Sequence, residues 1–203
     1  MTTPERSEGL LPAPGRGQYD RALTRERRQA EQRERLLVAT AAALAKGQAT
    51  VQGVIALAGV GRNTFYEYFD DFPHALAAVR ARAEARVELE CRSHVEQART
   101  TIERFRAIGR GWCGALLVSP TEARVLLGAE GRGPEQPLSS AGRILASAYE
   151  SAWSASSRST AQDRALIIAA AAAGEVLLLR ALGAPGELDP AVLVAQVAIR
   201  LLH

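Results

Sequence analysis

Apolar residues recur at helical spacing over most of the chain, and no stretch of any length alternates as a half-buried strand would. The first such pattern begins near Leu23, ends at Lys46 and places Leu37, Ala41 and Leu44 on one face. Glycine and proline cluster instead at three places: the N-terminus, residues 128–137 and residues 183–190. Because these two residue types interrupt helices, the segments between the clusters are expected to be helical, and the predicted fold class is all-α.

Two short helical patterns with a tight turn between them occupy residues 50–69. Thr50 is expected to cap the first, because its hydroxyl can accept a hydrogen bond from a free backbone N–H group. The turn is Ala58-Gly59-Val60, and glycine there can adopt the left-handed conformation that ends a helix. A helix, a tight turn and a second helix are typical of a helix-turn-helix, whose second helix lies in the major groove of DNA.

The helical pattern resumes at Asp71, which is expected to cap a helix that has Pro73 in its first turn and ends near Val95. Further helices are predicted at 101–117, 120–127, 138–157, 161–183 and 189–202. Three parts are therefore expected along the chain: a disordered arm rich in glycine and proline at 1–20, a helix-turn-helix domain at 21–70 and a larger helical domain at 71–203.

The helix-turn-helix segment contains the pair Thr50-Val51, the turn Ala58-Gly59-Val60 and the run Thr64-Phe65-Tyr66-Glu67-Tyr68-Phe69. These residues resemble the DNA-binding domain of the tetracycline-repressor (TetR) family of bacterial regulators. The resemblance is close over roughly residues 33–80 and elsewhere concerns helical layout only. It implies a three-helix DNA-binding domain followed by a larger helical domain that binds an effector and dimerises.

The resemblance also implies which side chains contact DNA. Gln52, Arg62 and Asn63 would face the bases, since arginine can read guanine and an amide can read adenine through paired hydrogen bonds. Phosphate contacts are expected from four hydroxyl-bearing side chains: Thr50, Thr64, Tyr66 and Tyr68. The alternative is that these are ordinary solvated residues, with Tyr66 packed against the first helix.

One position departs from the family pattern. Phe72 stands where the family commonly has a lysine, and Asp70 and Asp71 beside it would repel DNA. Compensating phosphate contacts are expected from Arg21, Arg25, Arg27 and Arg28, of which Arg25 and Arg28 are the predicted site residues. A solvated helix end explains that charge run equally well.

Large side chains gather in the middle of the second domain, where the resembled family encloses a ligand cavity. The residues expected to line it are Phe105, Trp112, Leu116, Leu127, Tyr149, Trp153 and Glu175. Aromatic walls with a few polar groups would suit a small apolar effector. The alternative is that each of these side chains belongs to the core.

The last two predicted helices, 161–183 and 189–202, carry more apolar surface than one wall of a helical bundle needs. Small side chains at 169–174 would permit close approach of another helix. In the resembled family, the last two helices of each subunit form a four-helix dimer interface. A homodimer through these helices is predicted, since one helix-turn-helix reads only half of a palindromic operator, and an intramolecular core is the alternative.

Composition limits the remaining possibilities. The chain has 203 residues and a net charge of +3, and its two cysteines, Cys91 and Cys113, form neither a disulfide framework nor a zinc-finger spacing. No metal or cofactor is expected. Residues 165–179 form an apolar run that is too short for a bilayer, and the N-terminus does not resemble a signal peptide, so a cytoplasmic protein without membrane contact is expected.

The predicted function is that of a sequence-specific DNA-binding transcriptional regulator, a repressor released from double-stranded DNA by a small apolar ligand. The first alternative is a constitutive dimeric DNA-binding protein without a ligand. The second is an all-helical enzyme, for which the sequence offers no glycine-rich phosphate loop, no Ser-His-Asp order and no carboxylate pair with apolar walls.

Overall fold

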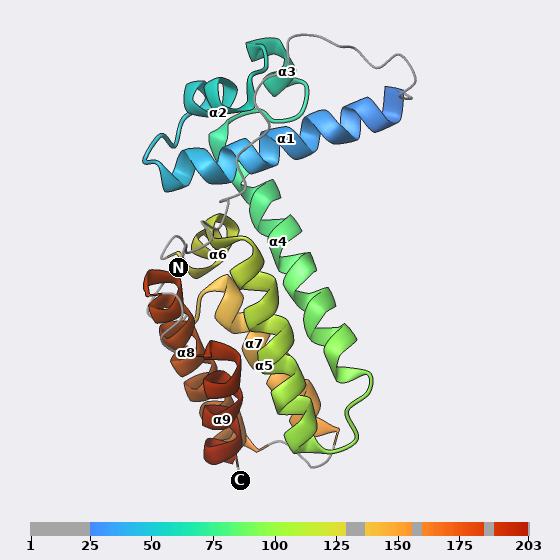
Figure 1. Ribbon diagram of the computed structural model, residues 1–203, viewed down its shortest axis with the longest axis vertical. Helices are drawn as coiled ribbons and strands as arrows, with labels where there is room; N and C mark the ends of the chain where they lie inside the picture. Colours follow the sequence, from blue (N-terminus) through green and yellow to red (C-terminus); the bar gives the residue numbers. More distant parts are fainter. Residues whose placement is uncertain (1–24, 129–136, 156–159, 185–188, 203) are drawn as a thin grey trace, which may run out of the picture. The chain divides into compact units, whose positions relative to one another are not determined.

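The computed structural model describes residues 25–128, 137–155, 160–184 and 189–202 (Figure 1). The elements of these ranges are helices and none is a strand, which confirms the all-α prediction. The helices are α1 Arg25–Ala45, α2 Val51–Ala58, α3 Arg62–Tyr66, α4 Phe72–Val95, α5 Thr101–Val118, α6 Pro120–Leu127, α7 Ser140–Ser154, α8 Ala161–Gly183 and α9 Pro190–Leu202. The arm predicted at 1–20 and most of the loop at 128–137 lie outside the described residues.

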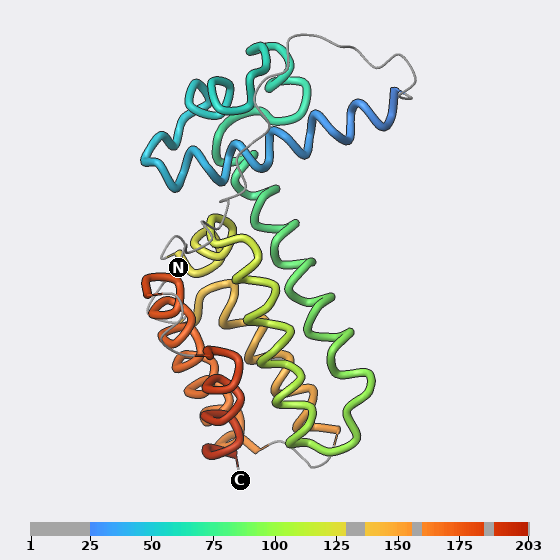
Figure 2. The backbone as a smooth tube through the Cα atoms, in the orientation of Figure 1, coloured from blue at the N-terminus to red at the C-terminus, as the bar shows by residue number. Residues whose placement is uncertain are grey.

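The chain divides into two compact units, and the boundary falls between Ala75 and Leu76, inside α4. The first unit contains α1 to α3 and the first turn of α4. The second contains the rest of α4 and α5 to α9. The tube in Figure 2 follows the backbone through both units.

The local signals at α2 and α3 act as the sequence predicts. Thr50 caps α2, and its hydroxyl accepts a hydrogen bond from the Gly53 amide at 3.1 Å. Gly59 ends α2 with φ 63° in the left-handed conformation, which glycine adopts without a steric penalty. The Val60 amide then donates to the carbonyl of Ile55, so the chain turns directly into α3.

The core of the first unit is made by one face of each helix. Both aromatic side chains that follow the turn are inside it, since Phe65 and Phe69 are buried with their rings 5.8 Å apart. The buried side chains from α1 and α2 include Leu37, Ala41, Val54 and Ala58, as their helical spacing predicts. The pair Phe65 and Phe69 thus anchors α3 and leaves its other face exposed.

The second unit is a bundle in which α5 packs against α7 and α9, and α8 packs against α7 and α9. Two large buried side chains of this bundle bond to backbone carbonyls, as burial favours. The Trp112 indole donates to the Ala141 carbonyl at 2.8 Å, and the Tyr149 hydroxyl donates to the Val194 carbonyl at 3.3 Å. These bonds fix the two largest core side chains between helices.

Two buried carboxylates tie helices of this unit together. Glu122 of α6 pairs with Arg82 and Arg86 of α4, the second at 2.7 Å. Glu175 of α8 accepts hydrogen bonds from the amide, at 2.8 Å, and the hydroxyl of Ser139. Ser139 also caps α7, and this cap explains why the helix begins at residue 140 and not at 138.

The apolar character of α8 extends beyond the run at 165–179. The whole helix has 23 residues and is long and apolar enough, by length and composition, to cross a membrane. The run at 165–179 is by itself shorter than a bilayer requires, and only the whole helix, which continues in both directions, reaches that length. The core helix of a soluble protein passes the same test, but such a helix is mostly buried. In α8, only 33% of the most apolar window is buried inside the chain itself.

Candidate nucleic-acid interface and ligand groove

Helix α3 exposes its first turn. Arg62 and Asn63 are exposed, Thr64 is half-buried, and Phe65 holds the opposite face in the core. The residue before the helix is Gly61, which makes no side-chain capping bond to the N-terminal turn. The predicted base-contacting pair Arg62 and Asn63 therefore projects from one anchored surface.

Arg62 is held by a side chain of its own helix. Its guanidinium lies 3.4 Å from the Tyr66 hydroxyl and 5.6 Å from the centre of the Tyr66 ring. Tyr66 is 45% exposed, and its ring meets the edge of Phe65 at 5.5 Å. The cation over the ring adds an attraction that limits the rotamers of Arg62.

Tyr68 forms a hydrogen bond to the first helix. Its hydroxyl donates to the Gln32 side chain of α1 at 3.1 Å. Partial burial, with a smaller effect of the Glu67 carboxylate, raises the pKa of Tyr68. The hydroxyl of Tyr68 is therefore already engaged within the protein, whereas the ring of Tyr66 reaches the surface.

The other predicted DNA contacts are distributed over α1 and α2. Gln52 is exposed on the first turn of α2, next to the exposed cap Thr50. On α1, Arg25 is exposed and Arg28 is half-buried. No described contact tests whether these side chains meet DNA, so their roles stay predictions.

The acidic residues before α4 have roles in the protein. The Asp71 carboxylate accepts from the His74 amide at 2.7 Å and so caps α4, as the sequence predicts. The imidazole Nδ1 of His74 lies 3.2 Å from the Asp70 carboxylate, and its ring packs on Phe69. The charge of Asp70 is thus placed beside a histidine.

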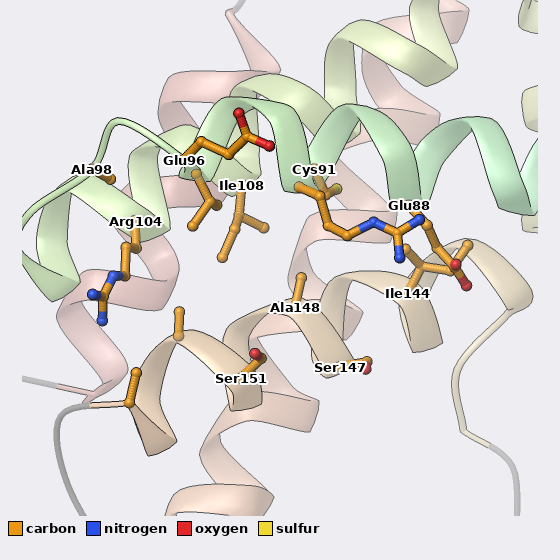
Figure 3. Close-up of a pocket in the computed structure, with 14 residues that line it drawn as sticks. Glu88, Cys91, Glu96, Ala98, Arg104, Ile108, Ile144, Ser147, Ala148 and Ser151 are labelled. Atoms are coloured by element: carbon orange, nitrogen blue, oxygen red, sulfur yellow. The ribbon is translucent and has the colours of Figure 1, made fainter.

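The second unit contains an open groove of about 740 Å³ between α4, α5 and α7 (Figure 3). This volume lies in the range of sites for small molecules. The side chains that line it are Glu88, Cys91, Arg92, Val95, Glu96, Ala98, Arg104, Ile108, Ile144, Ser147, Ala148, Ser151, Ala152 and Ala155.

The seven residues predicted to line a ligand cavity are absent from this lining. Phe105, Trp112 and Tyr149 are fully buried, and the Phe105 ring contacts those of Tyr149 at 5.1 Å and Trp153 at 6.4 Å. Leu116 and Leu127 are buried in the same core, and Glu175 is engaged by Ser139. The structure thus gathers the aromatic side chains in the core beside the groove.

The sequence interpretation missed the groove because small residues form most of its α7 wall. Ser147, Ala148, Ser151 and Ala152 recur at helical spacing, and short side chains leave space between helices. This repeat is the signal that could have indicated the groove. On the α4 side, burial raises the pKa of the Cys91 thiol to about 12, so it is a protonated, weakly polar part of the lining.

No group of three or more histidine, cysteine or acidic side chains that could hold a metal occurs among the described residues. Cys91 and His94 lie one turn apart on α4 but differ in their exposure to solvent. Cys91 is buried, whereas the His94 ring is exposed and lies 2.8 Å from the Glu90 carbonyl.

The overall architecture resembles solved bacterial regulators. A TetR-like transcriptional regulator from Rhodococcus sp. RHA1 superposes with TM-score 0.66 at 20% identity, covering 88% of this chain and 97% of that one. The fatty acid degradation regulator FadR from Bacillus halodurans gives 0.63 at 17% identity, with 84% and 94% covered. A bacterial regulatory protein in the tetR family from Rhodococcus RHA1 gives 0.60 at 16% identity, with 85% and 95% covered.

The sequence itself has no such counterpart: it matches no protein-family model, and no curated protein is similar to it. At these identities the superpositions concern the backbone, over 84–88% of this chain and nearly the full length of the others. The chain therefore has the fold of the TetR-type transcriptional regulators.

Proposed function

We propose that this protein is a DNA-binding transcriptional regulator of the TetR type. The observation that carries the proposal is the exposed first turn of α3, with Arg62 and Asn63 outside and Phe65 and Phe69 inside. An anchored short helix with a free polar face suits insertion into the major groove. The shared fold supports the same function.

In this proposal, Arg62, Asn63 and Gln52 contact bases, and hydroxyl and guanidinium groups around them contact phosphates. Thr50 can cap α2 and still donate its hydroxyl proton to a phosphate, because the capping bond uses only the oxygen lone pair. The hydroxyl of the exposed Tyr66 can likewise donate its proton to a phosphate. Thr64, Tyr68, Arg25 and Arg28 are the remaining proposed phosphate contacts.

The protein would act as a homodimer through α8 and α9. The outer face of α8 carries Ile168, Val176 and Leu179, each exposed, and Val192 and Leu201 are exposed on α9. The one acidic side chain between residues 165 and 179, Glu175, points inward and is buried. A second copy covering these exposed apolar side chains would remove them from water and place two α3 helices on one palindromic operator.

We further propose that it is a cytoplasmic repressor released by a small molecule held in the groove of the second unit. A ligand would release DNA only if it binds the released state more tightly than the DNA-bound state. By reciprocity, the operator must weaken ligand binding by the same factor.

Selection of duplexes from a random library with the full chain tests the proposed regulator. The expected product is a palindromic consensus, because two identical helices read two half-sites. A library that stays unenriched after several rounds, or that yields only unrelated sequences at low salt, would contradict a sequence-specific regulator.

A further inference from the structure

The groove between α4, α5 and α7 is mostly apolar along its length. Val95 and Ile108 contribute branched side chains, and Ile144 with Ala148 and Ala152 forms a stripe on α7. An unbranched apolar chain lying on this stripe would lose contact with water without meeting a large side chain. The apolar part of an occupant is therefore expected to follow α7.

One end of the groove carries a half-buried cation. Figure 3 shows Arg104 at the same end as Ala98, with Glu88 and Ile144 at the opposite end. Within the described ranges, the guanidinium of Arg104 has no hydrogen-bond or ion-pair partner. A half-buried guanidinium without an anion is a site where an oxyanion gains a charge-assisted, two-pronged contact.

The acidic side chain next to Arg104 in sequence is already engaged. The Glu103 carboxylate accepts from the amides of Arg99, at 2.8 Å, and Thr100, at 3.1 Å, as part of the box that caps α5. These bonds lower the pKa of Glu103, with the bond from Arg99 as the first cause. Glu103 is thus held at the helix cap by backbone partners.

The other charged residues of the lining are exposed. Glu88 and Arg92 lie on α4 and Glu96 directly follows it, and solvent screens the charges of all three. Arg104 differs from them because it is partly shielded from water. Its positive charge is therefore the one that selects the charge of an occupant.

We propose that the groove binds a small organic oxyanion with an unbranched apolar chain. The Arg104 guanidinium pairs with the oxyanion, and the chain lies against Ile108, Ile144 and Ala148. A carboxylate and a phosphate monoester share this chemistry. As the effector of the proposed regulator this ligand depends on the proposed function, but its binding in the groove can be measured independently.

Calorimetric titration of the full chain with decanoate, decyl phosphate and 1-decanol tests this assignment. At least one anion should bind the wild type about tenfold or more tightly than the neutral alcohol, as expected for a charge-assisted hydrogen bond. Arg104→Ala should abolish that preference. Arg106→Ala removes the same charge from an exposed position of α5 outside the lining and should preserve it.

Binding of one anion alone supports the proposal and identifies the headgroup. Equal affinity for 1-decanol, equal loss in both arginine variants, or no binding of either anion overturns it. Titration of duplex DNA without ligand separates this result from the regulator function. A protein that binds anions through Arg104 but no duplex contradicts the regulator, whereas one that binds duplex but neither anion contradicts the groove assignment.

Discussion

Arg62 and Tyr66 lie in direct contact on α3, and the energetic coupling between them in DNA binding can be predicted. Their side chains approach to 3.4 Å at the hydroxyl and 5.6 Å at the ring centre. Arg62→Ala should weaken binding to the operator by about 1–3 kcal/mol and relax one base position. Tyr66→Phe keeps the ring and removes only the hydroxyl, so it should cost about 0.5–1.5 kcal/mol.

The two losses should not add. In the Arg62→Ala background the Tyr66 hydroxyl has no guanidinium to orient, so its removal should cost less than in the wild type. Residues in contact usually couple by about 0.5 kcal/mol or more, above the error of additivity for distant sites. The double variant should therefore bind more tightly than the summed losses predict.

Fluorescence anisotropy with operator and scrambled duplexes at one salt concentration measures the affinities of the wild type, the two single variants and the double variant. A pure phosphate role for Tyr66 predicts the same loss on both duplexes and simple additivity with Arg62→Ala. If the double variant shows additive losses within error, the contact between Arg62 and Tyr66 does not orient the arginine on DNA. That result would refute the coupling and leave Tyr66 as an independent phosphate contact.

Three further predictions concern the second unit. Glu175→Ala should lower the free energy of unfolding in urea by about 1–3 kcal/mol, because the Ser139 amide loses its buried acceptor, and an unchanged midpoint would contradict this. Val176→Glu should dissociate the dimer in sedimentation and leave the helical circular-dichroism spectrum unchanged, because Val176 is 65% exposed on α8. The matched control is Leu89→Glu, which changes a side chain that is 59% exposed on α4 and should leave the protein dimeric. Thiol reagents should leave Cys91 unmodified at neutral pH, because burial raises its pKa to about 12 and the reactive thiolate forms only as pH approaches that value. Rapid labelling of the native protein would contradict this burial.

Much of the fold could be predicted because its local signals are strong and independent of tertiary context. Thr50, Gly59 and Asp71 end or begin helices through their own side chains or backbone conformation. The predicted start of α7 lies two residues before the observed one, because the extended backbone of the cap Ser139 is not visible in the sequence pattern. Helical periodicity gives no such boundary by itself.

Of the two candidate sites, one could be predicted from the sequence and the other could not. The position of Arg62 follows from a turn motif, so it could be read from sequence. The ligand groove could not, because a cavity results from what helices leave unfilled. Phe105 and Trp112 are predicted to line a cavity because they are large, but large side chains fill the core. The groove forms where α7 presents the small side chains of Ala148 and Ser151.

Competition between two duplexes shows whether α3 reads a specific DNA sequence. The full chain is titrated with the selected duplex and with the same duplex after its half-sites are scrambled, at one physiological salt concentration. The selected duplex should bind about 10³-fold or more tightly than the scrambled one, as expected for a sequence-specific regulator. Equal affinities for the two duplexes would instead show that the protein recognises only the phosphate backbone and that α3 does not read sequence.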